Sequence, residues 1–280
     1  MTSVAKTLGH REANLIVQLH EAGKPVFMLE DASKLTGLTG QSLQNLISRL
    51  TKKGIVSRLK SGLYTIVPFE LGQAKDYMPN PYLVARAIVR QQLGEDGGYY
   101  ISHASAMDLH QMVTQPQFIV HVTTNRQVKF HPTVMGTEYR FVTAQQKHFF
   151  GFKKLWIEKS QLVYISDLEK TVLDGLKMPE YSGGISEVAK GFWMKRDKIK
   201  VSKLIDYAER MDIGAVYRRL GFLLETYEAA TTEELDRLQG KLTRTYAPLD
   251  PTLPNVGTHL SRWRLNLNVD SDELLAVVRT

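Results

Sequence analysis

The chain of 280 residues contains no cysteine. A disulfide framework, a zinc site with thiolate ligands and catalysis by a thiol are therefore excluded. The sequence also has no run approaching the about 18 apolar residues that a membrane-spanning helix needs. Its first residues, MTSVAKTLGHREANLIV, lack the apolar segment and small-residue cleavage site of a secretory signal. From these absences we expect an intracellular, cytoplasmic protein without a membrane partner.

The two signs of charge are unequal. Lys and Arg total 36 and Asp and Glu total 29, which gives a formal net charge of +7. Apolar residues make up 43% and charged residues 23%, an ordinary globular composition that excludes a largely disordered chain. The length is sufficient for two compact domains. A positive net charge favours a polyanionic partner only weakly, so its position along the chain matters more.

The first seventy residues or so predict three helices followed by a hairpin. The helical segments, each with apolar residues at helical spacing, are 10–23, 29–36 and 40–53. Thr39 is placed to cap the third helix. Two alternating runs follow at 55–59 and 63–67, and Gly62 suits the turn between them. With its tight turn at 36–39, this order is that of a winged helix-turn-helix DNA-binding domain, which we expect to occupy residues 1–75.

The third predicted helix carries amides, hydroxyls and cations opposite its apolar stripe, and no carboxylate. From Ala32 to Phe69 the sequence has six Lys and Arg residues but no Asp or Glu. Amide side chains form bidentate contacts with adenine edges, and Lys and Arg contact guanine or phosphate. The predicted DNA-binding residues are Thr39, Gln41, Ser42, Gln44, Asn45, Ser48, Arg49, Lys52 and Lys53 of the helix and Arg58, Lys60 and Ser61 of the hairpin.

Double-stranded DNA is the partner that this pattern favours. If about four to six of the cations neutralise phosphates, the logarithm of the binding constant falls with the logarithm of the salt concentration at a slope of about −4 to −5. The alternative is a solvated polar face, or a winged helix that contacts only other proteins.

Residues 80–280 are predicted to form a second domain. Its α/β part, about 80–180, has strand candidates at 118–124, 139–143, 154–158 and 162–166. A helical part follows over about 185–245, and the alternating run WRLNLNV predicts a late strand, about 262–269, that returns to the sheet. The expected fold class is α+β, with an N-terminal winged helix-turn-helix before a mixed α/β and helical domain.

Three acidic residues, Asp167, Glu169 and Asp174, form the most enzyme-like group in the chain. Ser166 followed by Glu169 predicts a capping box, and Asp167 suits the first turn of a helix. Asp174 is one turn beyond Lys170 and is expected to pair with it. A metal-dependent nucleic-acid-modifying enzyme built on this group is therefore the weaker alternative, and we predict a protein that is not an enzyme.

The histidines and glycines suggest no cofactor. None of the eight histidines has a second ligand at the spacing of a zinc site. His121 is expected to be half-exposed on a strand, and Ser102 is expected to cap a helix over 103–112. The glycine pairs at 97–98 and 183–184 lack the spacing of a phosphate-binding loop. We predict no metal and no cofactor.

A second basic group lies in the helical part, with Asp197 as its only acid. Its members are Lys190, Lys195, Arg196, Lys198, Lys200 and Lys203, and Arg218 and Arg219 follow on the next long helix. This excess of one sign favours a positive surface that extends DNA contact or meets an RNA. The alternative is a solvated junction between helices.

Five segments together resemble a known family. They are TGLTGQSLQNLISRLTKKGIVSRLKSGLYTI (36–66), YYISHASAMDLHQM (99–112), FFGF (149–152), VYISDLEKTVLDGLKMPEYSGG (163–184) and VYRRLGFLLE (216–225). Their order and content resemble the AbiEi-type antitoxins of type IV toxin–antitoxin systems, which are also transcriptional regulators. The resemblance covers nearly the whole chain. It departs at Gln111, where the family has a small glycine.

The resemblance implies a repressor that binds repeats in the promoter of its own operon, several copies together. It also implies neutralisation of a nucleotidyltransferase-like toxin, which the antitoxin need not touch, through residues 80–280 as the antitoxin domain. A second hypothesis is a one-component regulator in which residues 80–280 sense a small ligand.

Overall fold

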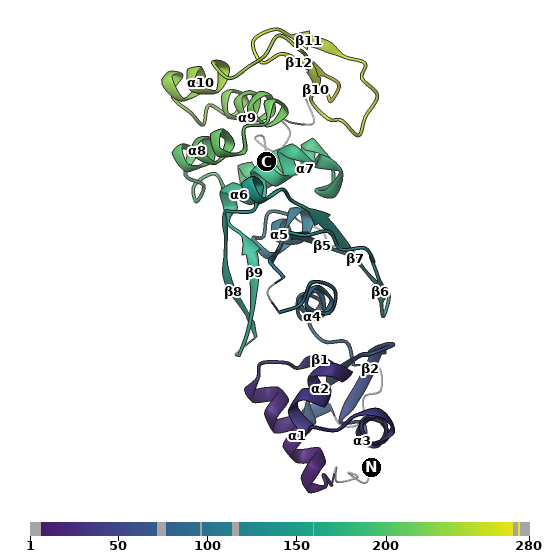
Figure 1. The fold of residues 1–280 in the computed structure, drawn as a ribbon. Coiled ribbons are helices and arrows are strands. Elements are labelled where there is room, and N and C mark those ends of the chain that lie inside the picture. Colours follow the sequence, from purple (N-terminus) through teal and green to yellow (C-terminus); the bar gives the residue numbers. More distant parts are fainter. Residues whose placement is uncertain are drawn as a thin grey trace. The chain divides into compact units, whose positions relative to one another are not determined.

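The computed structural model describes residues 7–71, 77–95, 97–113, 118–158, 160–270 and 274. The chain divides into two compact units. The first comprises Met1–Gly97, Lys129–Tyr139 and Trp156–Val163, and the second comprises Gly98–Val128, Arg140–Leu155 and Tyr164–Thr280. The fold is mixed α+β (Figure 1). No helix in the described residues has the length and apolarity to cross a membrane.

The first unit begins with three helices and three short strands. In chain order they are α1 (His10–Glu21), β1 (Val26–Met28), α2 (Leu29–Thr36), α3 (Gly40–Lys52), β2 (Val56–Lys60) and β3 (Leu63–Ile66). A 3₁₀ turn, η1 (Phe69–Leu71), and the helix α4 (Pro81–Leu93) follow. The three predicted helices and the predicted hairpin are confirmed to within two residues at each end, which is the usual uncertainty of helix and strand boundaries.

The core of this unit is built from the apolar stripes of its helices. Leu43, Leu46, Ile47 and Leu50 are the buried residues of α3, and they pack with α1 residues such as Leu15. Because these four positions recur every three to four residues, the helix buries one face and leaves the opposite face to solvent. The packing of α3 therefore fixes which side chains face outward.

The three N-terminal strands form an antiparallel sheet in the order β1-β3-β2. Gly62 has a φ of +77°, as the predicted turn requires, and the register of β2 shifts between Arg58 and Lys60. The sequence did not predict β1, because its three residues are too few for alternation to be recognised.

The predicted domain boundary between residues 75 and 80 does not coincide with the division between the units, because α4 belongs to the first unit. This helix packs against β1. Its Arg86 donates hydrogen bonds to the carbonyl oxygen of Gly23 (2.8 Å) and to Oε1 of Gln161 (2.7 Å). Arg90 pairs with the buried carboxylate of Asp31 at 3.0 Å. These arginines bind α4 to the N-terminal elements, which the sequence pattern did not indicate.

The larger sheet is mixed and has six strands in the order β6-β7-β5-β4-β9-β8. The strands are β4 (Tyr99–Ile101), β5 (Ile119–Thr124), β6 (Thr133–Val134), β7 (Thr137–Thr143), β8 (Phe152–Glu158) and β9 (Gln161–Ser166). β4 pairs antiparallel with β5 and parallel with β9. The four predicted strands of this region are all present. Alternation missed the two shortest strands, β4 with three residues and β6 with two.

Helices make up most of the rest of the second unit. They are α5 (His103–Leu109), α6 (Leu168–Lys177), α7 (Ile185–Lys195), α8 (Val201–Met211), α9 (Gly214–Thr226) and α10 (Thr232–Gln239), with the 3₁₀ turns η2 (Gln146–His148) and η3 (Pro179–Tyr181). Buried residues of α6 to α9, such as Val172 and Leu220, form one apolar cluster. Thr231 and Glu234 form a capping box at the start of α10.

The late strand was predicted to return to the large sheet, and this prediction is wrong. β12 (Leu265–Leu267) instead pairs parallel with β10 (Ala247–Pro248) and antiparallel with β11 (Thr258–Leu260) in a separate sheet. Trp263, which precedes β12 and is fully buried, packs against Gly221 of α9, where an added Cβ would lie 2.0 Å from its ring. The alternating apolar residues thus face the helical cluster.

Candidate nucleic-acid interface

The outward face of α3 is the first candidate site. The side chains of Thr39, Gln41, Ser42, Gln44, Asn45, Ser48, Arg49 and Lys52 are all exposed, and Lys53 is half-buried. In the hairpin, Arg58 and Ser61 are exposed and Lys60 is half-buried. Thr39 occupies the N-cap position of α3 with an extended backbone, but its side chain makes no capping hydrogen bond, contrary to the prediction.

Two amides on this face are bonded to each other. Nε2 of Gln41 donates to Oδ1 of Asn45 at 3.0 Å, one helical turn away. The bond uses one donor of Gln41 and one acceptor of Asn45. The amide nitrogen of Asn45 and the amide oxygen of Gln41 keep their hydrogen-bonding capacity, so the pair presents both donor and acceptor groups to solvent.

A carboxylate from α1 lies against the end of α3, which sequence reasoning missed. Glu12 is 4% exposed and accepts a hydrogen bond from Nζ of Lys53 at 2.6 Å. Nε of Arg49 lies 3.6 Å from the same carboxylate. Burial raises the pKa of Glu12, but Lys53, the Gly9 N–H and Arg49 together lower it below its usual value. Glu12 precedes Lys53 by 41 residues, so no local spacing indicates the pair.

The remaining cations of residues 32–69 differ in their surroundings. Lys34, Lys52 and Arg58 form no ion pair with any residue that the structure describes. Nζ of Lys60 lies 5.1 Å from the ring centre of Phe130, and burial lowers the pKa of this lysine. Phe130, itself 58% exposed, is a neighbour that the sequence did not suggest.

The second basic group is partly neutralised. Lys190 pairs with Glu187 at 3.2 Å, and Lys203 pairs with Asp167 at 3.0 Å and Glu169 at 2.8 Å. Arg196, Lys198 and Lys200 are exposed, and Lys195 is half-buried. The guanidinium of Arg196 lies 3.9 Å above the ring of Trp193.

Arg218 and Arg219 do not extend this surface, because each is only 4% exposed. Nη1 of Arg219 donates to the carbonyl oxygen of Leu176 at 2.6 Å. Nη2 of Arg218 donates to Thr243 and Thr245. Both arginines hold loops in place, so the prediction that they belong to a solvent-facing positive surface is wrong.

The acidic group does not converge on one point. The N-cap of α6 is Asp167, whose Oδ1 accepts from the backbone N–H of Lys170 at 2.9 Å. The predicted capping box of Ser166 and Glu169 is therefore wrong. The Ser166 hydroxyl bonds to the Thr171 hydroxyl at 2.7 Å. The carboxylate of Glu169 accepts from the backbone N–H of Lys200 at 3.0 Å and binds Lys203.

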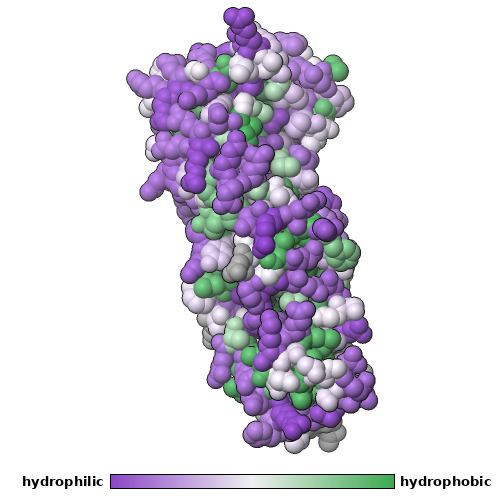
Figure 2. Space-filling model, viewed as in Figure 1, coloured by the Kyte–Doolittle hydropathy of each residue, from purple (hydrophilic) through white to green (hydrophobic). Residues whose placement is uncertain are grey.

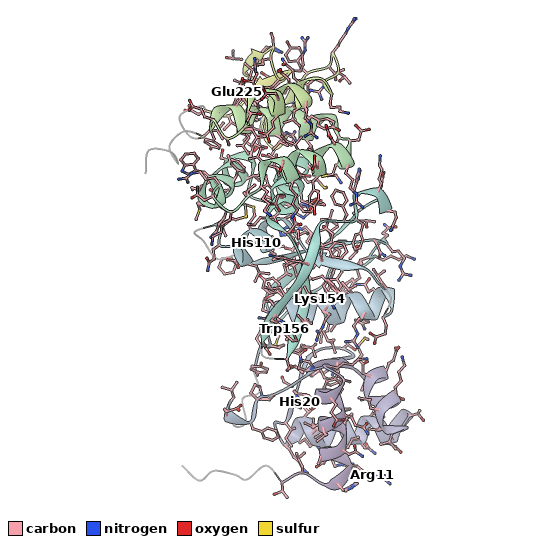
Figure 3. All side chains as sticks on the ribbon, turned by 90° about the vertical axis from the view of Figure 1, so that its left-hand side faces the viewer. Arg11, His20, His110, Lys154, Trp156 and Glu225 are labelled. Carbon is pink, nitrogen blue, oxygen red and sulfur yellow. The ribbon has the colours of Figure 1, made fainter. Side chains whose placement is uncertain are left out.

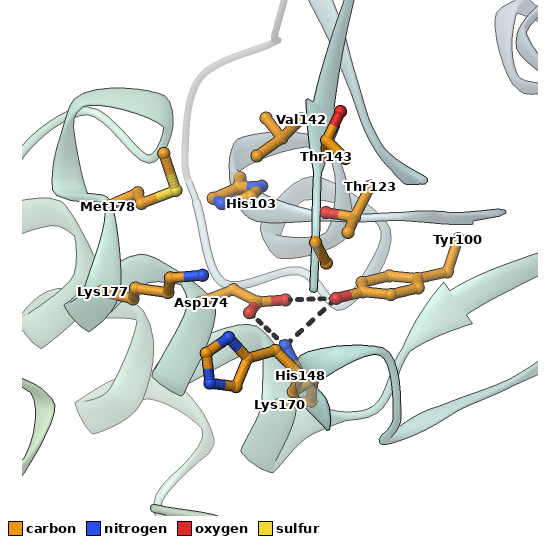
Figure 4. A pocket seen from close by; sticks show the side chains of 11 residues that line it. Tyr100, His103, Thr123, Val142, Thr143, His148, Lys170, Asp174, Lys177 and Met178 are labelled. Carbon is orange, nitrogen blue, oxygen red and sulfur yellow. Dashed lines mark hydrogen bonds and ion pairs between the residues drawn. The ribbon is translucent and has the colours of Figure 1, made fainter. Parts of the chain in front are cut away.

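Asp174 lies in a separate buried network, shown in Figure 4. It pairs with Lys170, as predicted, and its Oδ2 accepts a hydrogen bond from the Tyr100 hydroxyl at 3.2 Å. Nζ of Lys170 donates to the same hydroxyl at 3.1 Å. Burial and the neighbouring Asp174 raise the pKa of Tyr100 well above its usual value. The three polar groups bind one another, whereas Asp167 and Glu169 both bind Lys203, so Asp174 has different partners from the other two acids.

Two buried histidines complete this region. His103 is fully buried, and burial lowers its pKa to about 3. Its Nδ1 lies 2.8 Å from the Ser102 hydroxyl, so Ser102, although at the N-cap position of α5, has no side-chain capping bond. His121 is 4% exposed rather than half-exposed as predicted, because both faces of β5 are covered. Among the described residues, no group of three or more histidines and acids is placed to hold a metal ion.

Comparison with known proteins shows a likeness of fold to a solved structure. No protein-family model and no curated protein sequence matches the chain. The fold is similar to a crystal structure of the Rv2827c protein from Mycobacterium tuberculosis, with a TM-score of 0.67 and 14% sequence identity. The similarity covers 98% of this chain and 96% of that chain. At this identity the likeness is one of fold, and it extends over nearly the whole mixed α+β architecture.

Proposed function

We propose that this chain is a DNA-binding transcriptional repressor that also acts as the antitoxin of a type IV toxin–antitoxin system. In this proposal the helices α1 to α3 and the strands β2 and β3 act as a winged helix-turn-helix. The helix α3 enters the major groove, and the hairpin contacts the flanking backbone. The order of these elements and the exposed face of α3 support this arrangement.

The observation that carries the proposal is the composition of the exposed face of α3. It holds amides, hydroxyls and cations, and the carboxylate nearest to it, Glu12, is buried. Lys52 and Arg58 are exposed and have no carboxylate partner in the described chain. A surface cation without a carboxylate partner breaks no ion pair when it binds phosphate, whereas a paired cation must first give up its partner.

The amide pair on α3 gives the interface a means of reading sequence. Adenine presents one donor and one acceptor in the major groove, N6–H₂ and N7. The free donor of Asn45 and the free acceptor of Gln41 match this pattern. We therefore expect Asn45 to be a base contact and Lys52 and Arg58 to be phosphate contacts.

The antitoxin part of the proposal rests on the resemblance of the five motifs to the AbiEi-type antitoxins. In that scheme the protein acts in the cytoplasm and neutralises a nucleotidyltransferase-like toxin without needing to touch it. The second unit would carry the antitoxin activity. Its distinct apolar cluster supports a separate role for this part of the chain.

DNA binding is tested with a variant that removes two unpaired cations. Duplexes are first selected from a random pool by the full-length protein, and affinities are then measured at several salt concentrations. Lys52→Ala/Arg58→Ala should lose about tenfold or more in affinity and reduce the salt slope by about two, with an unchanged melting temperature. The matched control is Lys147→Ala/Lys154→Ala, which removes two exposed cations elsewhere. Equal losses in the two variants would contradict the assignment of the interface.

The antitoxin role is tested in cells that carry a neighbouring nucleotidyltransferase gene. Co-expression of the chain should restore growth. Lys52→Ala/Arg58→Ala should still protect the cells while failing to repress a reporter behind the operon promoter. Growth arrest that the wild-type chain does not relieve would remove the antitoxin proposal and leave DNA binding unaffected.

A further inference from the structure

A polar hollow of about 160 Å³ lies in the second unit, between the end of α10 and the segment before β12. Its lining includes three arginines, Arg244, Arg262 and Arg264, together with the hydroxyls of Thr243 and Ser261. No carboxylate belongs to its described lining. The molecular surface around α8 to α10 and the C-terminal strands is mostly hydrophilic in Figure 2. An anion is the ligand class that such a lining selects.

Arg262 is held in a fixed direction. Its Nε lies 2.5 Å from Oε1 of Glu225, a residue of α9 that is labelled in Figure 3. The other oxygen of this carboxylate accepts from the indole N–H of the buried Trp263 at 2.6 Å. Because Glu225 holds only the Nε side of the guanidinium, the two Nη groups keep their donors free of any partner among the described residues.

Arg264 has a strained backbone, with a φ of +52°. Its Nη1 lies 3.5 Å from the Tyr246 hydroxyl, which in turn donates to the Ser261 hydroxyl at 3.3 Å. Residues other than glycine keep a left-handed conformation only where their surroundings impose it, and such residues occur frequently at binding sites. A neutral hydroxyl is the one hydrogen-bond partner that the structure gives this guanidinium.

A fourth arginine supports the wall of the hollow. Arg218 is buried, and its Nη2 donates to the carbonyl oxygen of Thr245 at 2.9 Å and to the Thr243 hydroxyl at 2.7 Å. No carboxylate in the described chain pairs with it. Burial and the charge of Arg264 lower the pKa of Arg218. Arg244 is exposed and likewise unpaired.

Four guanidinium groups therefore occupy one small region, and one of them has a carboxylate partner. Like charges at this density destabilise a folded protein unless an anion binds among them. We propose that the hollow is a binding site for the phosphate group of a small phosphorylated molecule. Guanidinium groups bind phosphate oxygens in a bidentate manner, and the Thr243 and Ser261 hydroxyls supply further donors. A concave site of this volume fits one phosphate group with a small substituent better than a continuous nucleic-acid backbone.

The test uses the full chain with three probes: inorganic phosphate, adenosine monophosphate and a short single-stranded RNA. Isothermal titration calorimetry should give saturable binding of both small phosphates at constant ionic strength. Arg244→Gln should weaken that binding about tenfold or more, since a charge-assisted hydrogen bond is lost. Lys241→Gln, which removes an exposed cation nearby but outside the lining, is the matched control and should bind as the wild type does.

A second variant separates loss of binding from loss of folding. Arg264→Gly removes a guanidinium but suits the positive φ, so its melting temperature without phosphate should not fall. Phosphate binding should nevertheless weaken about tenfold. Absence of saturable binding, unchanged binding in both arginine variants, or binding of the RNA alone would each overturn the proposal. No residue of the hollow belongs to the proposed DNA interface. A failure of the phosphate proposal is therefore distinguishable from a failure of DNA binding, which has its own test.

Discussion

Glu12 determines which cations at the end of α3 remain free. Lys53 forms an ion pair with this buried carboxylate, whereas its sequence neighbour Lys52 is exposed and pairs with no carboxylate among the described residues. The two lysines look alike in the sequence and have different roles in the structure. This difference explains why composition identifies a cationic region but does not separate its exposed cations from those bound to a carboxylate.

The two neighbouring lysines provide the first prediction. Lys53→Ala should lower the free energy of unfolding by about 1 kcal/mol, because Glu12 keeps its burial and loses a hydrogen bond to a charged group. Lys52→Ala should change it by less than about 0.5 kcal/mol. In DNA binding the order should reverse, with the larger loss for Lys52→Ala. Urea unfolding and gel-shift titration of the same two proteins check both halves, and an equal effect of the two variants on stability would contradict the role of Glu12.

Gln111 occupies the place where the resembled family has glycine. It follows the C-cap of α5, with its N–H bonded to the carbonyl of Asp108 and the N–H of Met112 bonded to that of Met107. This is a Schellman motif, whose residue after the cap is left-handed and most often glycine. Gln111 keeps that conformation, with a φ of +56°. Glutamine in place of glycine at this position therefore strains the backbone but leaves the fold unchanged.

The second prediction follows from this strain. Gln111→Gly should stabilise the protein by about 0.5–1 kcal/mol. Glycine adopts the left-handed conformation without strain, and this gain exceeds the cost of the larger backbone entropy that glycine has in the unfolded chain. Gln111→Val should destabilise it, because a branched Cβ fits this region worst. The side chain is exposed, so no packing is lost in either variant. Thermal and urea unfolding measure the effect, and a loss of stability in Gln111→Gly would refute it.

His103 makes stability depend on pH. Its pKa is lowered to about 3 in the folded chain by burial, while the unfolded side chain titrates near 6.5. Below pH 6.5 the unfolded state thus binds a proton that the folded state does not bind, so stability falls as the pH falls. From pH 6.5 to 5 the expected loss is about 2 kcal/mol.

The control variant for this third prediction is His103→Asn, which tolerates the φ of +51° at this position. Burial also lowers the pKa of His110 and His148, so both proteins lose stability on acidification. The wild type should lose more. Parallel pH profiles of the two proteins, measured by urea unfolding, would show that His103 is not the group responsible.

At the scale of elements, the spacing of apolar residues predicted the longer helices and strands and missed the shortest strands. The helices α7 to α10 have apolar residues at regular spacing over two turns or more, and they lie within the helical part that was predicted over about 185–245. β1 and β4 have three residues each, too few for a period of two to be distinguished from chance. The partner of β12 depends on contacts of Trp263 with a helix distant in sequence, so alternation identified a strand but not its sheet.

The contact between α9 and Trp263 gives the fourth prediction. Alanine in place of glycine normally stabilises a helix by about 1 kcal/mol. At Gly221 the added methyl group meets the buried indole ring, and overpacking of this kind costs about 1–3 kcal/mol or more. Gly221→Ala should therefore destabilise the chain. Gly240→Ala is the control and should be nearly neutral. Gly240 lies at the end of α10 with a right-handed φ of −62°, and an added Cβ would meet only ordinary van der Waals contacts, 3.4 Å from the nearest atom.

At the scale of the whole molecule, the distribution of charge revises the expected salt dependence. Four to six cations of residues 32–69 bound to phosphate would give a slope of about −4 to −5, but Lys53 is bound to Glu12 and Lys60 is half-buried beside Phe130. Three cations remain unpaired, with Arg49 at 3.6 Å from Glu12 as a partial fourth. The fifth prediction is a slope of about −3 for DNA binding, measured by fluorescence anisotropy over a range of salt concentrations.

The two compact units also show a limit of sequence reasoning. The first unit contains segments 129–139 and 156–163, which lie well beyond the predicted boundary. Composition and turn residues indicate where a chain leaves a compact unit, but they do not indicate which later segments pack back into that unit. The arginine-lined hollow was missed for the same reason, since its residues come from two stretches about twenty residues apart, each unremarkable alone.

The bond between Glu225 and the indole of Trp263 has an optical consequence. The same carboxylate holds Arg262, so an anion that attracts this guanidinium alters the electrostatic environment of the ring. Trp156, at 64% exposed, is accessible to a soluble quencher, whereas Trp263 is fully enclosed. Trp193 is half-buried and would also emit. In a Trp193→Phe variant with the neutral quencher acrylamide present, the residual emission should come mainly from Trp263 and change in intensity as the hollow fills, which gives the protein an intrinsic fluorescent sensor.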